Sequence, residues 1–264
     1  MIPTPQENND AEVLSELKDG VLTLTLNRPA KFNALSGPMI ATLQAAFDTL
    51  PPEARCVVIA GTGKALCAGH DLAEMRDNRD RAFYEELFAA GSRLMQAIVA
   101  CPVPVICRVH GMAFAAGVQL VCSCDLAIAG ESATFAVSGV KLGLFCSTPA
   151  VALSRNVAPK RAFDLLITGR PIGAREALEA GIVGTVVPDA ELDAAVARLA
   201  GDIVAKSPVA VRAGKAVFGP QRGLPLAEAY DYAGRIMVEN AMSQDAAEGM
   251  AAFTEKRPPV WTGR

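Results

Sequence analysis

At 264 residues the chain is long enough to bury a large core, and its 51% hydrophobic and 20% charged residues are typical of one globular domain, with or without an appended helical region. The formal net charge of −3 argues against a nucleic-acid partner, because it provides no broad attraction for phosphates. Apolar runs such as "VVIA" are far too short to cross a bilayer, so no membrane partner is expected. A small molecule is the expected ligand.

The first ten residues, "MIPTPQENND", have neither the apolar segment of a signal peptide nor the Arg- and Ser-rich character of a transit peptide. They predict a cytoplasmic protein. Seven cysteines, an odd number, are scattered through apolar stretches, which favours reduced thiols. A metal cofactor is not expected, since the chain contains no CxxC and only His70 and His110 could supply imidazole.

The first half of the chain alternates strand-like and helix-like segments. "EVLSELKDGVLTLTLNRP" has strand-like runs on either side of Asp19 and Gly20, which predicts a hairpin. We predict a helix over residues 36–50, with Ser36 as its N-cap, and then a buried strand at "CVVIAG". A helix over about 80–100 follows, then a strand at "VPVICRVHG", a helix at "AFAAGVQLVCSC" and a strand at "DLAIAG".

Helical patterns dominate from about residue 147 onward. The strand-like "IVGTVVP" is an exception, and amphipathic patterns cover ranges that include 190–206 and 226–256. This shift predicts a core formed by residues 1–200 and a helical C-terminal region formed by residues 201–264.

Two segments rich in small residues are candidate anion sites. "ALCAGHDL" and "HGMAFAAGVQL" each follow a strand-like run and lead into a helical pattern, so each can direct free backbone N–H groups at an anion. The alternative is that their Ala and Gly residues only allow a helix to pack closely on a strand. The fragment "GTGKAL" is not a P-loop, because Val58 stands where the first glycine of that motif belongs.

The order of these segments resembles the crotonase superfamily, also called the enoyl-CoA hydratase/isomerase family. The resemblance runs along nearly the whole chain, through "LNRPAKFNAL", "GTGKALCAGHDLAEM", "PVPVICRVHGMAFAAGVQLVCSCDLAIAGESATFAV", "LLITGRPIGAREALEAGIVGTVVP" and "DAAEGMAAFTEKRPPVW". The details "AGHDL", "AAGVQL" and "GVKLGLFCSTP" are most similar to the subgroup called enoyl-CoA hydratase domain-containing protein three. The resemblance implies an α/β fold, a crotonase-like spiral of ββα units with a helical C-terminal trimerisation region. It also implies an acyl-CoA thioester as the ligand and a homotrimer or a dimer of trimers as the assembly.

The resemblance further implies which residues contact the ligand. The backbone N–H groups of His70 and Ala116 fall on the two oxyanion donors of the family, which stabilise negative charge on the thioester oxygen. Four basic residues match the family's contacts to the CoA phosphates, the last of them from a neighbouring subunit: Arg28, Lys31, Lys64 and Lys256. Because CoA is part of the substrate, no separate cofactor is implied.

Two positions depart from the family pattern. Hydratases of this family use two glutamates to exchange protons with the added water, and these fall on Gln119 and Gly139. An amide does not titrate and glycine has no side chain, so neither residue can act as an acid or a base. The resemblance therefore implies weak or altered hydratase activity.

Two functions remain open at this point. One is a lyase or isomerase that uses the oxyanion donors together with a relocated acid or base. The His70 imidazole and the Cys146 thiol are the candidates for that group, although packing is the expected role of the imidazole and buried thiols are usually inert. The other function is a non-catalytic protein that binds or sequesters acyl-CoA.

Overall fold

The computed structural model describes residues 11–264, and its largest element is a six-stranded sheet. The strands lie in the order β1 (Val13–Lys18), β2 (Val21–Leu26), β3 (Cys56–Gly61), β5 (Val105–Val109), β7 (Leu126–Gly130) and β10 (Thr185–Val187). β1 is antiparallel to β2, and the other pairs in this sheet are parallel. The hairpin prediction is confirmed, since Asp19 and Gly20 have φ values of 50° and 78°, as a tight turn between twisted strands requires.

A second sheet consists of four short strands. They lie in the order β4 (Ala65–Cys67), β6 (Met112–Phe114), β8 (Thr134–Ala136) and β9 (Ile172–Gly173). Each of β3, β5 and β7 is followed in the chain by one strand of this second sheet and then by a helix. This ββα unit therefore occurs three times in succession, which confirms the predicted spiral.

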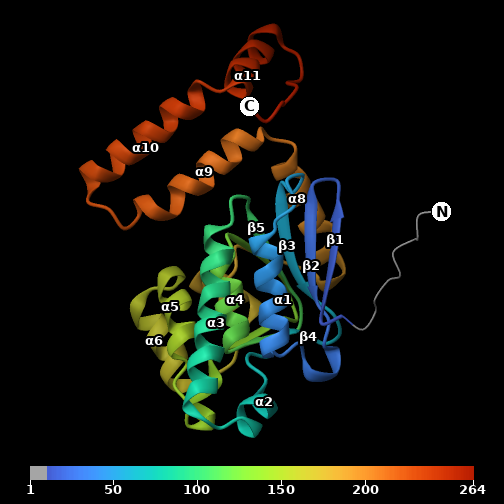
Figure 1. Cartoon of the computed structure of the whole chain (residues 1–264), viewed down its shortest axis with the longest axis vertical. Helices are drawn as coiled ribbons and strands as arrows, with labels where there is room; N and C mark the ends of the chain where they lie inside the picture. The colour runs from blue at the N-terminus through green and yellow to red at the C-terminus, as the bar shows by residue number, and fades with distance from the viewer. Residues whose placement is uncertain (1–10) are drawn as a thin grey trace, which may run out of the picture.

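Helices cover both faces of the large sheet (Figure 1). The residues of β3 alternate: Cys56 and Val58 pack with α8, whereas Val57 and Ile59 belong to the larger core cluster on the opposite face. The helices of this part of the chain are α1 (Gly37–Asp48), α2 (Leu72–Asp77), α3 (Arg81–Ala100), α4 (Ala116–Ser123), α5 (Ser147–Asn156), α6 (Pro159–Thr168), α7 (Ala174–Ala180) and α8 (Leu192–Val204). The predicted cap of α1 is confirmed, because the Ser36 hydroxyl accepts a hydrogen bond from Met39 N at 3.2 Å.

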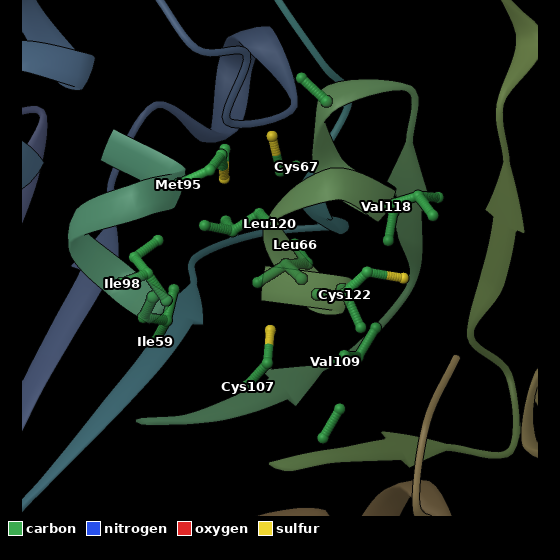
Figure 2. Packing of buried hydrophobic residues seen from close by; sticks show 14 of the residues in the cluster. Ile59, Leu66, Cys67, Met95, Ile98, Cys107, Val109, Val118, Leu120 and Cys122 are labelled. Atoms are coloured by element: carbon green, nitrogen blue, oxygen red, sulfur yellow. The ribbon is translucent and has the colours of Figure 1, made fainter. Parts of the chain in front are cut away.

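Helix α4 lies in the middle of the larger core cluster, and every one of its residues is buried. Figure 2 shows its side chains among those of α3 and β5: Val118, Leu120, Cys122, Met95, Ile98, Cys107 and Val109. Apolar packing on all sides fixes the position of a short helix that intrinsic propensity alone would not hold. The first residues of α4 are therefore held in place by the core.

The C-terminal helices form a lobe that projects from the core (Figure 1). They are α9 (Pro208–Gln221), α10 (Leu226–Ala241) and α11 (Gln244–Glu255). The pattern over 226–256 is divided after α10, because the Ser243 hydroxyl accepts a hydrogen bond from Ala246 N and begins α11. The boundary placed after residue 200 falls within α8, and the division into two regions remains a prediction.

An ion pair between a half-buried lysine and an exposed aspartate joins the lobe to the core. The ammonium of Lys215 on α9 lies 2.6 Å from the carboxylate of Asp125 and donates hydrogen bonds to the carbonyls of Ile98 and Val103. Asp125 also accepts a hydrogen bond from Val105 N. Asp125 therefore has a structural role, and it fixes both β5 and α9.

Three further properties concern residues 11–264 as a whole. No helix within them has both the length and the apolar character that a membrane span needs. Their His, Cys, Asp and Glu side chains form no group of three that could hold a metal ion. The seven cysteines are unpaired, and all except Cys124 are buried.

Candidate functional site

The two segments rich in small residues lie side by side at one edge of the second sheet. β4 leads through residues 68–71 into α2, and β6 leads through Ala115 into α4. Because β4 and β6 are parallel neighbours, the turns that follow them emerge at the same edge. Gly117 supports this arrangement: a β-carbon on it would lie 2.2 Å from the Cys67 carbonyl oxygen, so only glycine allows α4 to approach β4 this closely.

The backbone N–H of His70 points away from Leu35, the residue with which it forms an isolated β-bridge. Leu35 N donates to Gly69 O at 2.7 Å, and Asp71 N donates to Leu35 O at 3.1 Å. In this parallel bridge the bonds to Leu35 come from the residues on either side of His70, and amide directions alternate along an extended chain. The N–H of His70 is therefore directed to the opposite side, where no described residue accepts its hydrogen bond.

The N–H of Ala116 is free for a different reason. Ala116 is the first residue of α4, and the first N–H groups of a helix have no acceptor within the helix. A β-carbon on Gly69 would lie 3.4 Å from Ala116 N, so the two segments are in contact. The structure therefore brings the N–H-bearing backbones of His70 and Ala116 together.

The side chain of His70 packs away from these N–H groups, against α3. Its ring makes an edge-to-face contact with Phe88 at a centroid distance of 5.4 Å, and a β-carbon on Gly91 would lie 3.3 Å from Nε2. Nε2 is buried without a partner, and burial lowers the pKa of the imidazole to about 4. The imidazole is therefore neutral at pH 7.

Gln119 is buried one turn beyond Ala116, on the same face of α4. No described residue forms a hydrogen bond with its side-chain amide. The amide is available to a ligand or to water, and it can donate or accept a hydrogen bond without changing its charge.

Gly139 lies in a short 3₁₀ helix, Ser138–Leu142, where the space for a side chain is already filled. A β-carbon on Gly139 would lie 2.6 Å from the Leu144 carbonyl oxygen and 2.7 Å from Cys146 Sγ. Gly139 N also donates a hydrogen bond to Cys146 Sγ at 3.3 Å. The position that the resemblance assigns to the second glutamate is therefore closed by the segment that follows it.

The four basic residues have different surroundings. The guanidinium of Arg28 is engaged by Glu12 at 3.1 Å, Asp71 at 3.0 Å and Ala34 O at 2.9 Å. Lys31 and Lys64 are exposed and belong to touching segments, since a β-carbon on Gly63 would lie 2.6 Å from Pro29 Cβ. Lys256 follows α11, at the opposite end of the molecule from β4 (Figure 1). Of the four, only Lys31 and Lys64 are exposed cations on segments that contact each other within the described part of the chain.

Asn33 was not among the candidates, yet it fixes this edge. It is fully buried, accepts a hydrogen bond from Arg28 N, and donates to the carbonyls of Thr62 and Ala65. The bond to Ala65 positions the start of β4. Its φ of 54° fits the tolerance of asparagine for left-handed backbone, but the sequence offers no periodic pattern that would have indicated this role.

The family model and two similar sequences all point to enoyl-CoA hydratases. The family model described as "Enoyl-CoA hydratase/isomerase" matches residues 16–264. The human "Enoyl-CoA hydratase domain-containing protein 3, mitochondrial" is 43% identical over 92% of this chain and 81% of that protein. A "Probable enoyl-CoA hydratase" from Rhodobacter capsulatus is 34% identical over 94% of this chain and 97% of that protein.

Solved structures agree with this relationship. An enoyl-CoA hydratase from Mycobacterium smegmatis superposes with a TM-score of 0.93 and 51% identity, over 95% of this chain and 99% of that one. The human domain-containing protein 3 superposes with a TM-score of 0.91 and 41% identity, over 95% of this chain and 100% of that one.

The names of several relatives correct one expectation. The matching proteins from mouse, human, rat, Xenopus laevis and Danio rerio are all named as mitochondrial. These names contradict the cytoplasmic location expected from the first ten residues, and that expectation is withdrawn. Those residues lie outside the described part of the chain.

Proposed function

Because the chain belongs to the enoyl-CoA hydratase/isomerase family, we propose that it binds an acyl-CoA thioester whose carbonyl oxygen accepts hydrogen bonds from His70 N–H and Ala116 N–H. The observation that carries this proposal is the close approach of two segments in which the N–H groups of His70 and Ala116 have no acceptor among the described residues. Donors held by secondary structure reorient little when negative charge develops on an oxygen.

Among the described residues, the proposed site lacks a side chain that is suited to transfer protons. Gln119 and Gly139 cannot titrate, the His70 imidazole packs on Phe88, and burial raises the pKa of the Cys146 thiol. Loss of one general acid or base typically slows a reaction by about 10²–10⁴-fold. In this proposal the protein therefore hydrates enoyl-CoA slowly, or it catalyses a different reaction that proceeds through an enolate.

Non-catalytic binding of acyl-CoA is the second candidate function. The closed space at Gly139 favours it, because the Leu144 carbonyl oxygen and Cys146 Sγ occupy the place of a second catalytic side chain. An intact pair of N–H donors would still hold a thioester without turning it over.

In this proposal the CoA phosphates contact Lys31 and Lys64, which are exposed and lie on segments that contact each other. Arg28 is less available, since three groups engage its guanidinium. Lys256 acts from a neighbouring copy, because α11 lies at the opposite end of its own molecule. The assembly is a homotrimer or a dimer of trimers.

A structure of the protein with crotonyl-CoA, together with calorimetric titration and a hydration assay, tests the proposal. A thioester oxygen within about 3.5 Å of both nitrogens supports it. A distance of more than about 4 Å from both nitrogens contradicts the binding site. Steady-state hydration at about 10 s⁻¹ or faster contradicts slow proton transfer, whereas tight binding without turnover selects the non-catalytic function.

A further inference from the structure

Ala115 has a backbone conformation that an L-residue rarely adopts. Its φ is 47° and its ψ is −110°. Phe32 and Lys256 also have positive φ, but their ψ values of 35° and 42° place them in the left-handed helical region, which turns and helix ends commonly use. Ala115 lies far from that region. Strained backbone of this kind persists only where the surroundings impose it, and it concentrates at functional sites.

The conformation turns a strand into a helix within one residue. Ala115 N donates to Ala136 O of β8 at 2.7 Å, and Ala115 O accepts from Gln119 N of α4 at 3.2 Å. Ala115 O and Ala116 N–H belong to the same trans peptide, in which C=O and N–H point in opposite directions. Since the carbonyl points along α4, the N–H of Ala116 must leave the helix at its N-terminal end.

The methyl group of Ala115 also contacts the opposite segment. A β-carbon on Gly69 would lie 3.1 Å from Ala115 Cβ and 3.2 Å from Phe114 O. Gly69 has a φ of 102°, which glycine adopts without strain. The Ala115 methyl is thus seated against the bare α-carbon of Gly69, next to His70, and limits how closely the two segments approach.

We infer that Ala115 is a positioning residue: its strained backbone directs the N–H of Ala116, and its methyl group sets the spacing between that N–H and the N–H of His70. This inference rests on the proposed thioester site. A glycine at position 115 would accept the same φ and ψ at lower cost but would also allow many others. Compared with glycine, alanine in this conformation lowers the stability of the folded protein but restricts the backbone at position 115 to one geometry.

Ala115→Gly tests the inference, with crotonyl-CoA labelled with ¹³C at the thioester carbonyl as the probe. The variant is expected to be at least as stable to heat as the wild type, because it relieves strain. It is expected to bind the probe about tenfold more weakly, a fraction of the 10²–10³-fold that loss of one whole oxyanion donor costs. Isotope-edited infrared spectra should show a smaller low-frequency shift of the bound carbonyl than in the wild type.

Asp19→Gly is the matched control, because Asp19 also has positive φ, at 50°, in the β1–β2 turn. It should relieve strain and leave both binding and the carbonyl shift unchanged. Ala115→Ser keeps the β-carbon and should retain most of the wild-type shift.

The outcomes separate the inference from the proposed function. If the wild type binds the probe with no carbonyl shift, or does not bind it, the proposed site is wrong and the inference falls with it. If the wild type shows the shift and Ala115→Gly matches it in shift and affinity, only the inference is wrong. An Ala115→Gly variant that is clearly less stable than the wild type also overturns the inference, because lost packing would then explain weaker binding.

Discussion

Gly139 is constrained by the space around it and not by its backbone angles. Its φ lies outside the positive range that favours glycine, but the Leu144 carbonyl oxygen and Cys146 Sγ lie within contact of any added β-carbon. A backbone oxygen cannot move as the end of a flexible side chain can. Placing a glutamate at this position would therefore require the segment 142–146 to shift, as well as a substitution.

We predict that Gly139→Ala lowers the free energy of unfolding by roughly 1–3 kcal/mol, the usual cost of overpacking. Gly201→Ala is the control, because a β-carbon on that exposed glycine of α8 meets nothing within 4 Å. It should raise the stability by roughly 0.5–1 kcal/mol. Urea unfolding of both variants measures the difference, and a Gly139→Ala protein as stable as the wild type would show that the segment yields easily.

His70 should make the stability depend on pH in a defined window. Its pKa is about 4 in the folded protein, because burial disfavours the charged ring, against an ordinary value of 6.5. Between these pH values the unfolded chain binds more protons than the folded one. His70 therefore does not lower the free energy of unfolding above pH 6.5, and lowers it progressively as the pH falls toward 4. The full loss is as much as about 3 kcal/mol.

Urea unfolding of the wild type and of His70→Gln at pH 7 and pH 4.5 checks this dependence. The difference between the two pH values should be smaller in the variant. His110 provides the comparison, since burial and Arg108 also lower its pKa, and it remains in both proteins. An equal loss of stability in the wild type and in His70→Gln would show that the imidazole accepts a proton without cost.

Among the elements, the long helix α3 was predictable from the sequence and the two-residue strand β9 was not. The helix predicted over about 80–100 is observed as Arg81–Ala100, with Asp80 as its cap. Local information sufficed there, because the periodic pattern and the cap lie in the same segment. β9 has only two residues, and it exists because Phe135 of β8 pairs with Ile172. No pattern in the sequence around either residue could have predicted that pairing.

The same distinction applies to the candidate site. The small-residue segments were compatible with free N–H groups or with close helix–strand packing, and only the family resemblance pointed to His70 and Ala116. The seating of Ala115 on Gly69 and the closure of Gly139 by Leu144 depend on how segments meet in space. Residue types alone do not determine such contacts, so the resemblance suggested the two donors but not the spacing between them.

The C-terminal tail is bound to the lobe by one buried carboxylate. Asp245, at 1% exposure, accepts hydrogen bonds from Ser207 Oγ at 2.7 Å, Thr262 N at 2.7 Å and Gly263 N at 3.1 Å. Ser207 caps α9 and Asp245 lies in the first turn of α11. The carboxylate therefore joins the starts of two helices to the last residues of the chain.

Asp245→Asn should destabilise this junction, because an amide must turn its NH₂ toward at least one of these donors. We expect a loss of roughly 1–3 kcal/mol, the cost of leaving a buried polar group unpaired. Hydrogen exchange should accelerate in α11 and residues 260–264 and remain unchanged in β3 and β5. Asp231→Asn, at an exposed position of α10, should change nothing, and unchanged exchange in Asp245→Asn would contradict the role of the carboxylate.

On the scale of the molecule, the lobe leaves large apolar side chains uncovered. Leu226, Tyr230, Met242 and Phe253 are each more than 70% exposed. Monomeric proteins rarely leave such residues gathered on one projecting region, whereas subunit interfaces bury them. The proposed trimer would cover them and bring Lys256 of one copy toward another.

Multi-angle light scattering checks the assembly. The wild type is expected to have the mass of a trimer or a hexamer, and Tyr230→Glu combined with Met242→Glu should shift the population to smaller species. Lys18→Glu, on the exposed edge strand β1, is the charge-changing control and should leave the mass unchanged. A wild-type protein that remains monomeric at high concentration would contradict the proposed assembly.

The N–H groups of His70 and Ala116 belong to the main chain, and this affects how the protein can change by mutation. Nineteen of the twenty amino acids supply a backbone N–H, and only proline lacks one. A substitution at either position that the packing accommodates therefore keeps the N–H group itself, whereas the chemistry of a side-chain acid or base is lost when its residue is replaced. In the proposed site, a lineage could therefore lose or exchange side-chain acids and bases and still keep the two main-chain donors.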